Sequence, residues 1–317
     1  MQTYIARRLL LIIPTLVLVT IIVFGSMRLI PGNVVELMVQ EHSGLVEVNV
    51  DKIRHEMGLD KPILVQYATW IKDIFTEGDL GESLWTGRSA VDELRQRLPI
   101  SFELGLIAII IGLIIALPVG ILSGIRQDTV GDYASRTLAI LFIALPSFWT
   151  GTLVMVFPAV WWNWSPSMVY IPLVKDPLGN LVQFLIPGVL LGMTLSGTTM
   201  RMTRTMMLEV LRQDYVRTAW AKGLRERAVV AQHVLKNAVI PVVTVVGLQL
   251  PVLFGGSIVL EQIFNLPGVG VYMIQTINSR DYNVLSGINL VMAFTVLLIN
   301  LGVDLTYGFL DPRIRYK

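Results

Sequence analysis

The chain has 317 residues, no cysteine and a formal net charge of +2. Hydrophobic residues make up 54% of it and charged residues only 15%, whereas roughly 25% of an ordinary soluble domain is charged. This composition predicts a membrane protein, and the lack of cysteine excludes disulfides, thiolate catalysis and cysteine metal sites.

A transmembrane helix needs roughly 20 apolar residues, and six uncharged stretches of this chain are long enough. Helices are expected because lipid offers no partner to an unpaired backbone amide. The sequence therefore predicts an all-α integral membrane protein with six transmembrane helices. In chain order we expect the spans at Leu9–Met27, Leu104–Ile125, Leu138–Trp161, Pro177–Met200, Asn237–Leu260 and Tyr282–Val303, the last continuing to about Leu310.

The first stretch could instead be a cleaved secretory signal. At 19 residues, Leu9–Met27 is longer than the short apolar region of such a signal, and Phe24–Pro31 offers no small-x-small cleavage site. We therefore expect a permanent transmembrane helix here.

The segment from Pro31 to Ile100 is too long and too patterned to be a bare connector. After Pro62, apolar residues recur at helical spacing, and glycines interrupt the pattern further on. We expect a small folded cap with a helix at Ile63, Tyr67, Trp70, Ile71 and Ile74, breaks at Gly78, Gly81 and Gly87, and a short helix over Val91–Leu98 before Pro99 opens the next span. The cap is either a structural lid or a docking surface for a partner that delivers substrate.

The uncharged tract from Thr137 to Val174 exceeds one span. Aromatic residues and prolines gather in its second half, as is typical of a membrane interface followed by a surface loop. We assign that role to Trp161, Trp162, Trp164 and Tyr170, with Pro158, Pro166 and Pro172 between them.

The segment from Arg201 to Lys236 is predicted to continue the fourth helix through Leu211 and then to form a short helix. Tyr215, Ala219 and Lys222 fall on one side of that helix. Small residues precede Gly223, which can end a helix with a positive φ. A short helix with small side chains can sit deep in a groove of another protein. A solvated basic loop and a basic patch for anionic lipid are the alternatives.

Orientation follows from the bases, because cytoplasmic loops carry an excess of Lys and Arg. Two arginines precede the first span, eight bases against three acids separate the fourth and fifth spans, and three bases follow the sixth. We therefore expect these segments and both termini in the cytoplasm. The segment Pro31–Ile100, with twelve acids and seven bases, is expected outside.

The sequence contains few groups that could catalyse a reaction. No GxxxxGK[ST] loop for nucleotide phosphates occurs, and the three histidines, His42, His55 and His233, lie outside the expected spans. His55 and Glu56 lack the second histidine of a zinc HExxH helix, and Ser257 has no base within membrane depth. We therefore expect a protein that is not an enzyme.

An ion-coupled secondary carrier needs ionisable groups near the bilayer midplane. Here Arg28, Glu261 and Asp304 fall near span ends, where snorkelling or ordinary interface placement accounts for them. This disfavours a secondary carrier, which stays open as an alternative together with a structural scaffold. Gln249 and Asn300 are polar residues near mid-span and candidates for a translocation path, unless they only hydrogen-bond neighbouring helices.

Specific strings point to a family. RTAWAKG (Arg217–Gly223) resembles the EAA loop of the membrane subunits of bacterial ATP-binding-cassette importers, in which a short helix docks into a cleft on the ATPase. More narrowly, the whole chain resembles the inner-membrane permease of the dipeptide/oligopeptide/nickel uptake family. The supporting strings are GDLGESLWTG (Gly78–Gly87), ALPSFWTG (Ala144–Gly151), DYVRTAWAKGL (Asp214–Leu224), GGSIVLEQIFNLPGVG (Gly255–Gly270), RDYNVLSG (Arg280–Gly287) and DPRIRYK (Asp311–Lys317).

This resemblance implies a type I ABC importer permease fold in a bacterial or archaeal cytoplasmic (inner) membrane, with an extracytoplasmic cap between helices 1 and 2. It implies a homologous second permease, two ATPase subunits and an extracytoplasmic substrate-binding protein as partners, with ATP and Mg held by the ATPases and no cofactor on this chain. Short peptides are the first expectation for the substrate, and nickel chelates or oligosaccharides are alternatives. The expected ATPase-coupling residues are Tyr215, Arg217, Thr218, Ala219, Ala221, Lys222 and Gly223.

Two positions depart from the general importer pattern. Arg217-Thr218-Ala219 stands where that pattern has Glu-Ala-Ala, so a glutamate contact to the ATPase is not carried over. Lys236 stands where it has proline, and the nearest proline is Pro241.

The expected organisation is the first span in 1–30, the cap in 31–100, a core in 101–310 that includes the coupling loop 201–236, and a tail in 311–317.

Overall fold

The computed structural model describes residues 2–29, 55, 60–83 and 85–310. The expected tail 311–317, and residues 31–54 and 56–59 of the expected cap, lie outside the described residues. Among those that are described, helices form all the regular structure apart from one isolated antiparallel bridge between Glu82 and Ser89. The chain divides into two compact units: one holds Ile100–Gly270 and the part from Ile299 onward, the other Gln2–Pro99 and Val271–Leu298.

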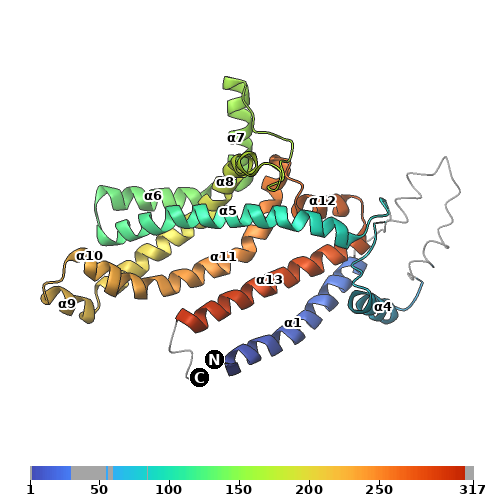
Figure 1. Cartoon of the computed structure of the whole chain (residues 1–317), viewed down its shortest axis with the longest axis horizontal. Helices are drawn as coiled ribbons and strands as arrows, with labels where there is room; N and C mark the ends of the chain where they lie inside the picture. Colours follow the sequence, from blue (N-terminus) through green and yellow to red (C-terminus); the bar gives the residue numbers. More distant parts are fainter. Residues whose placement is uncertain (1, 30–54, 56–59, 84, 311–317) are drawn as a thin grey trace. The chain divides into compact units, whose positions relative to one another are not determined.

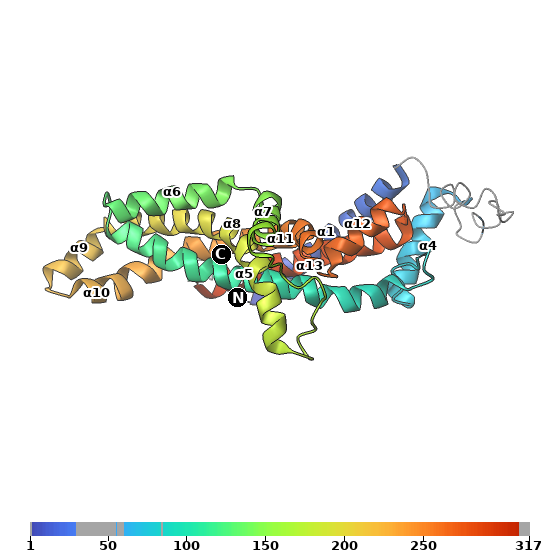
Figure 2. The same cartoon turned by 90° about the horizontal axis from the view of Figure 1, so that it is seen from above.

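The first unit is a helical bundle. In Figures 1 and 2, α5, α6, α8 and α11 run side by side, and α7 leaves this group at a steep angle. Its helices are α5 (Ala90–Ile125, from Ile100), α6 (Val130–Ala144), α7 (Ser147–Trp162), α8 (Pro177–Leu211), α9 (Asp214–Ala221), α10 (Glu226–Val229), a π-helical turn η1 (Val230–Val234), α11 (Leu235–Ile263) and the second part of α13 (Tyr282–Leu310).

Helix α8 lies at the centre of this bundle because small residues let two neighbours approach its backbone. A β carbon on Gly192 would lie 2.7 Å from the carbonyl oxygen of Ala108 on α5. One on Gly197 would lie 2.7 Å from the carbonyl oxygen of Ala139 on α6. Both positions exclude any larger residue, so close backbone packing of the kind that joins membrane helices holds α5, α6 and α8 together.

The expected third span is not one helix. The prediction of a continuous helix over Leu138–Trp161 is wrong, because the chain bends by 93° between α6 and α7. Leu145 is extended at the bend, with φ −80° and ψ 117°, and Pro146 caps α7. Proline disfavours helical geometry in the residue before it and cannot donate a hydrogen bond to the preceding turn.

The short helix expected over Val91–Leu98 is not separate either. Helix α5 runs without a break from Ala90 through Pro99 to Ile125. Buried residues lie on both sides of the proline, at Leu94 and at Ile100 and Leu104. The helix therefore continues through Pro99 and does not restart there.

The other five expected spans coincide with helices. Five helical stretches are long and apolar enough to cross a membrane, and the bent pair α6 and α7 makes a sixth if it is counted as one span. The five stretches are Arg8–Leu29, Ala90–Ile125, Pro177–Leu211, Glu226–Pro251 and Tyr282–Thr306.

Glu261 is buried rather than snorkelling at the interface, which corrects the expectation for this residue. Its side chain accepts hydrogen bonds from the Ser101 hydroxyl at 2.6 Å, the Ser257 hydroxyl at 3.1 Å and the backbone N–H of Gly270 at 2.9 Å. The Ser101 hydroxyl in turn accepts a bond from the N–H of Val269 at 2.9 Å. The carboxylate thus fastens the turn after α11 to α5, which gives the string LEQIFNLPGVG a structural role.

The second unit contains α1 (Gln2–Leu29), α4 (Ile63–Thr76), the start of α5, α12 (Val269–Asn278, from Val271) and the start of α13. Helix α4 follows Pro62 as predicted. It packs on α1 through aromatic rings, since Tyr67 and Trp70 lie 5.5 and 5.6 Å from the ring of Phe24. The glycines expected to interrupt the chain after α4 all have positive φ: Gly78 (67°), Gly81 (103°) and Gly87 (64°).

Helix α12 was not predicted, and its packing rests partly on Tyr272. The Arg97 guanidinium lies 4.6 Å from the centre of that ring. Burial, together with the nearby Glu93 and Asp281 carboxylates, raises the pKa of Tyr272 to about 12. The hydroxyl therefore stays protonated, and the ring meets Arg97 as a neutral aromatic.

Candidate functional site

Helix α9 is short and ends where the sequence predicts. The N–H of Lys222 bonds to the carbonyl of Thr218 at 3.1 Å, and that of Gly223 to the carbonyl of Trp220 at 2.9 Å. Gly223 follows with φ +76°, the left-handed conformation that suits glycine. In Figures 1 and 2, α9 and α10 lie at the end of α8 and α11 away from α7.

The inward side of α9 is apolar and holds the helix in place. Val216 is fully buried and Ala219 is 5% exposed. They belong to a cluster with Met207, Val229, Val230, Val234 and Ala238, drawn from α8, α10, η1 and α11. Burying a valine side chain contributes about 1.5–3 kcal/mol, so this contact keeps α9 attached to the bundle.

A hydrogen-bonded bridge adds to this attachment. The side-chain amide of Asn237, at the start of α11, donates to the Tyr215 hydroxyl at 2.9 Å and to the carbonyl of His233 at 3.0 Å. Tyr215 is nevertheless 44% exposed. The bridge ties α9 to the π-helical turn and to α11.

The outward side of α9 is small and polar. At about 100° per residue, Arg217, Thr218 and Ala221 lie opposite the buried pair, and all three are exposed. Trp220 borders this side and is 41% exposed, and Leu224 beyond the helix is 42% exposed.

Six of the seven expected coupling residues are exposed, and Ala219 is not. The Ala219 side chain is buried in the inward cluster, where it helps to position α9. The sequence placed Tyr215, Ala219 and Lys222 on one side of α9. Part of that side, at Ala219, is packed against the bundle. Trp220 and Leu224 were not predicted from the sequence. Trp220 could have been noticed, because it is a large aromatic residue on a helix with few other apolar residues.

A buried ion pair joins the helices α5, α6 and α8 near the end that carries α9. Asp132, on α6, accepts two bonds from the Arg204 guanidinium on α8, from Nε at 2.6 Å and from Nη2 at 2.8 Å. The Ser123 hydroxyl on α5 donates to the same carboxylate at 2.5 Å. One buried side chain thus joins α5, α6 and α8, and the cluster that holds α9 includes Met207, one turn beyond Arg204.

The two candidates for a translocation path are not brought together by hydrogen bonds. The Gln249 amide donates to the Thr199 hydroxyl on α8 at 3.4 Å and to the carbonyl of Val245 at 3.3 Å. Asn300 is exposed on α13. An apolar groove of about 380 Å³ lies between α5, α11 and α13, and it is lined by their sequence neighbours Leu250 and Ile299 rather than by the two residues themselves. Their role in a path stays a prediction.

Within the described part of the chain, no cluster of three or more His, Asp or Glu side chains could hold a metal ion. The polar groups of the α9 region are hydroxyls, amides, bases and the exposed carboxylates of Asp214 and Glu226.

Comparison with known proteins decides the family. Residues 116–316 match the family described as "Binding-protein-dependent transport system inner membrane component", and residues 1–105 match its N-terminal companion family. The chain belongs to this family. It is a non-catalytic membrane component of a transport system, as the sequence predicted.

Two named relatives align along their whole length. The dipeptide transport system permease protein DppB of Escherichia coli (strain K12) is 37% identical over 340 residues, and the alignment covers 100% of each chain. DppB of Alkalihalophilus pseudofirmus is 38% identical over 336 residues, again with 100% of each chain covered.

Solved structures agree on the fold. A structure of the MetNI methionine ABC transporter in an inward-facing conformation contains a chain with a TM-score of 0.54 and 18% identity, covering 69% of this chain and 96% of that one. A chain of an amino acid ABC transporter solved with histidines gives a TM-score of 0.50 at 13% identity, covering 70% and 94%. The all-helical permease fold is therefore shared, while most sequence positions differ.

Proposed function

We propose that this chain is the permease subunit of an ATP-binding-cassette importer that takes up short peptides. The observation that carries the coupling part of this proposal is α9, a two-sided helix anchored by Val216 and Ala219 with a small, polar outward side. Relatives that align over the whole chain are named as dipeptide transport permeases, which supports peptides as the substrate.

The proposed assembly contains a homologous second permease, two ATPase subunits and an extracytoplasmic substrate-binding protein. ATP and Mg are held by the ATPases, and this chain binds no cofactor. The family description, which names a binding-protein-dependent system, supports the external partner. Nickel chelates or oligosaccharides as cargo would use the same machinery.

The proposed topology has six spans with both termini in the cytoplasm. The bent pair α6 and α7 counts as the third span, with its break at Leu145–Pro146. Eight bases against three acids in 201–236 support a cytoplasmic position for α9. The segment 31–100 then forms the extracytoplasmic cap.

Coupling follows from the two sides of α9. Thr218 and Ala221 let an ATPase groove approach closely, Arg217 and Lys222 offer charges to it, and Trp220 and Leu224 supply apolar contact at its edges. When ATP closes the ATPase pair, α9 moves with the groove, and the buried cluster passes the displacement to α8 and α11. The contact must differ between the two states, since a contact of equal strength in both shifts nothing. Gln249 and Asn300 are proposed to face the path that opens.

Gly223 offers the sharpest test of this proposal. No atom lies within 4 Å of the position of its β carbon, so a substitution there strains only the backbone. A left-handed conformation costs an ordinary residue about 1–2 kcal/mol and a β-branched residue more, whereas asparagine tolerates it. Gly223→Val should therefore uncouple ATP hydrolysis from uptake in the reconstituted complex, and Gly223→Asn should retain most of the coupling.

The measurement is the ratio of peptide imported to ATP hydrolysed in proteoliposomes, with the amount of inserted permease determined in parallel. We expect normal insertion for both variants and a ratio at least about tenfold lower for Gly223→Val. A Gly223→Val permease with normal coupled uptake would count against α9 as the coupling element.

A further inference from the structure

A second polar site lies in the unit that contains α1 and α4. It is a hollow of about 340 Å³ walled by the end of α1, by α4, by the loop at residues 79–82 and by the start of α13. All of its lining residues belong to this one unit. The volume lies near the lower end of the range of pockets that take small ligands, roughly 300–1,000 Å³.

The hollow is lined by charges of both signs. Arg28 and Lys61 supply two cations, and Asp73, Asp79 and Glu82 supply three carboxylates. Across the described residues, none of these five charges forms an ion pair with another side chain. The neighbouring Asp60, by contrast, already bonds to His55 at 2.7 Å, and that bond lowers the pKa of its carboxyl group.

Arg28 is the most constrained of these charges. Its guanidinium lies 5.1 Å from the centre of the Phe24 ring and is half-buried at the end of α1. Its Nε is shielded from solvent and has no hydrogen-bond partner among the described residues. A partly desolvated guanidinium favours a carboxylate as its partner, since that pairing supplies both charge and acceptors.

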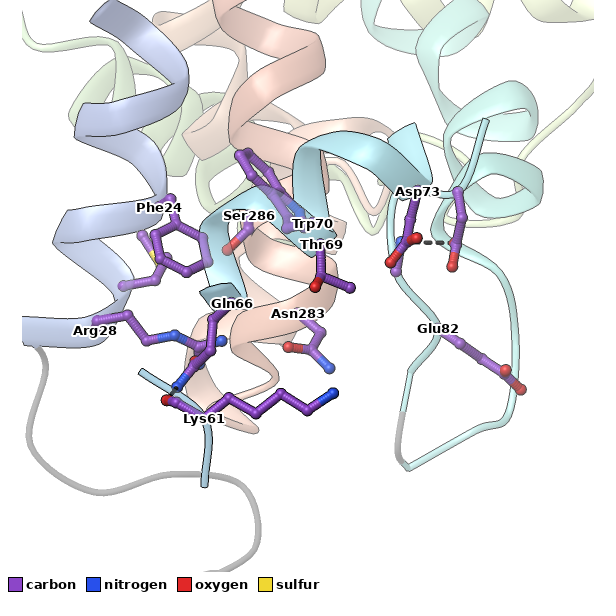
Figure 3. A pocket seen from close by; sticks show the side chains of 13 residues that line it. Phe24, Arg28, Lys61, Gln66, Thr69, Trp70, Asp73, Glu82, Asn283 and Ser286 are labelled. Carbon is purple, nitrogen blue, oxygen red and sulfur yellow. Dashed lines mark hydrogen bonds between the residues drawn. The ribbon is translucent and has the colours of Figure 1, made fainter. Parts of the chain in front are cut away.

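Arg28 and two of the carboxylates stand on opposite sides of the hollow, and Lys61 reaches toward its middle. Figure 3 shows Arg28 beside α1 and Asp73 and Glu82 at the other side, with Thr69 and Asn283 between them. Lys61 extends across the lower edge of the same view. A ligand that lies across the hollow would therefore meet a cation at one end, hydroxyl and amide groups in the middle and carboxylates at the other end.

We propose that this hollow binds the zwitterionic backbone of a di- or tripeptide, with the peptide carboxylate at Arg28 and the ammonium group at Asp73 and Glu82. This inference rests on the proposed function, since it takes peptides as the cargo and the cap as its external side. It adds a binding site on the permease itself. Thr69 and Asn283 are placed to bond the peptide group between the two charged ends.

Other ligand classes fit this hollow less well. The described residues contain no group of three acidic or histidine side chains that could hold a metal ion, although three carboxylates line the hollow. A simple anion would meet three acids against two bases. An apolar ligand would cover the half-buried Arg28 and Asp73 side chains without supplying a partner to either charge. Only a ligand with both charges neutralises both sides.

The test uses the full chain in lipid nanodiscs, without ATPase or binding protein, and a radiolabelled dipeptide in equilibrium binding. Arg28→Gln and Asp73→Asn each remove one charge from the hollow. Lys72→Gln and Glu77→Gln are matched controls, because both residues are exposed on or just after α4 and neither lines the hollow. We expect each hollow variant to weaken binding by roughly tenfold or more and the controls to bind like the parent chain.

Capping the peptide tests the same contacts without changing the protein. An N-acetylated dipeptide and a dipeptide amide each lack one terminal charge, and each should bind the unmodified chain roughly tenfold or more weakly. The inference is overturned if the uncapped dipeptide does not bind, if both hollow variants bind it normally, or if capping changes nothing.

A separate measurement tests the proposed function independently of peptide binding at the hollow. ATP-driven uptake of the same dipeptide is followed in the assembled complex. Uptake without binding at the hollow removes only the present inference. Charge-dependent binding at the hollow in a complex that imports no peptide supports the site and contradicts the proposed function.

Discussion

Asp132 shows how one buried side chain sets the geometry of three helices. Its carboxylate lies among Arg204, Ser123 and the backbone N–H of Asp128, and Arg136 approaches to 3.3 Å. A buried carboxylate is tolerated because these groups replace the water that it loses. The sequence places Asp132 only between two spans, and nothing in its spacing predicts the partner 72 residues away.

Replacing Asp132 by asparagine should therefore destabilise the chain. The amide keeps the shape but leaves the buried part of the Arg204 guanidinium without its counter-charge. We expect a loss of about 2–3 kcal/mol, below the full effect for a deeply buried pair because Arg204 and Arg136 retain some exposure. Thermal unfolding in detergent measures it. Asp128→Asn is the control, because Asp128 is 63% exposed and makes just one long ion-pair contact, 3.7 Å, with Arg136. An equal loss of stability in both variants would contradict the role assigned to Asp132.

At the scale of elements, α9 and the α6–α7 break differ in how far the sequence could predict them. The short helix and its glycine stop are local features, and the structure confirms both. The break at Pro146 depends on what the flanking residues pack against. Gly151 on α7 lies against Leu260 and Ile263 of α11, a contact between residues more than a hundred positions apart. A proline in an apolar tract indicates a kink, but only such contacts decide whether the helix bends slightly or turns by 93°.

Trp220 provides a prediction at the same scale. A large aromatic side chain at the edge of a docking surface often carries a large share of the binding energy. Trp220→Ala should weaken binding of the ATPase subunits by about 2 kcal/mol, or roughly 30-fold, with little effect on the stability of the permease alone.

The measurement for Trp220 is the affinity of purified ATPase for permease in nanodiscs. Trp162→Ala is the matched control, because Trp162 is an exposed tryptophan at the end of α7, far along the chain from α9. Equal ATPase affinity for both variants would remove Trp220 from the docking surface.

At the scale of the whole molecule, the placement of charged residues indicates which energy source drives transport. A secondary carrier needs an ionisable group that gains and loses an ion during transport. Glu261 is buried among donors that fasten the turn after α11, so it has a structural role. Among the described residues, this arrangement favours an external source of energy for transport over an ion gradient.

The assembled complex should therefore import labelled dipeptide only with ATP. We expect uptake in proteoliposomes to fall to background when ATP is replaced by a non-hydrolysable analogue and to be unchanged by ionophores that collapse proton and sodium gradients. Permease reconstituted alone serves as the control and should show no uphill transport. Gradient-driven uptake by the permease alone would contradict the proposed function.

The sequence by itself determined the fold class, five of the long apolar helices, the short helix before Gly223 and the family, because hydrophobic periodicity, glycine stops and linear strings are local properties. Only the tertiary structure decided that Ala219 faces inward, that Glu261 is buried, that two helices replace the expected third one and that α5 continues through Pro99. It also decided that Arg28, Lys61, Asp73 and Glu82 share one hollow. The physical reason is that burial, pairing and the response to a proline depend on side chains distant in the sequence, which come together only when the helices pack.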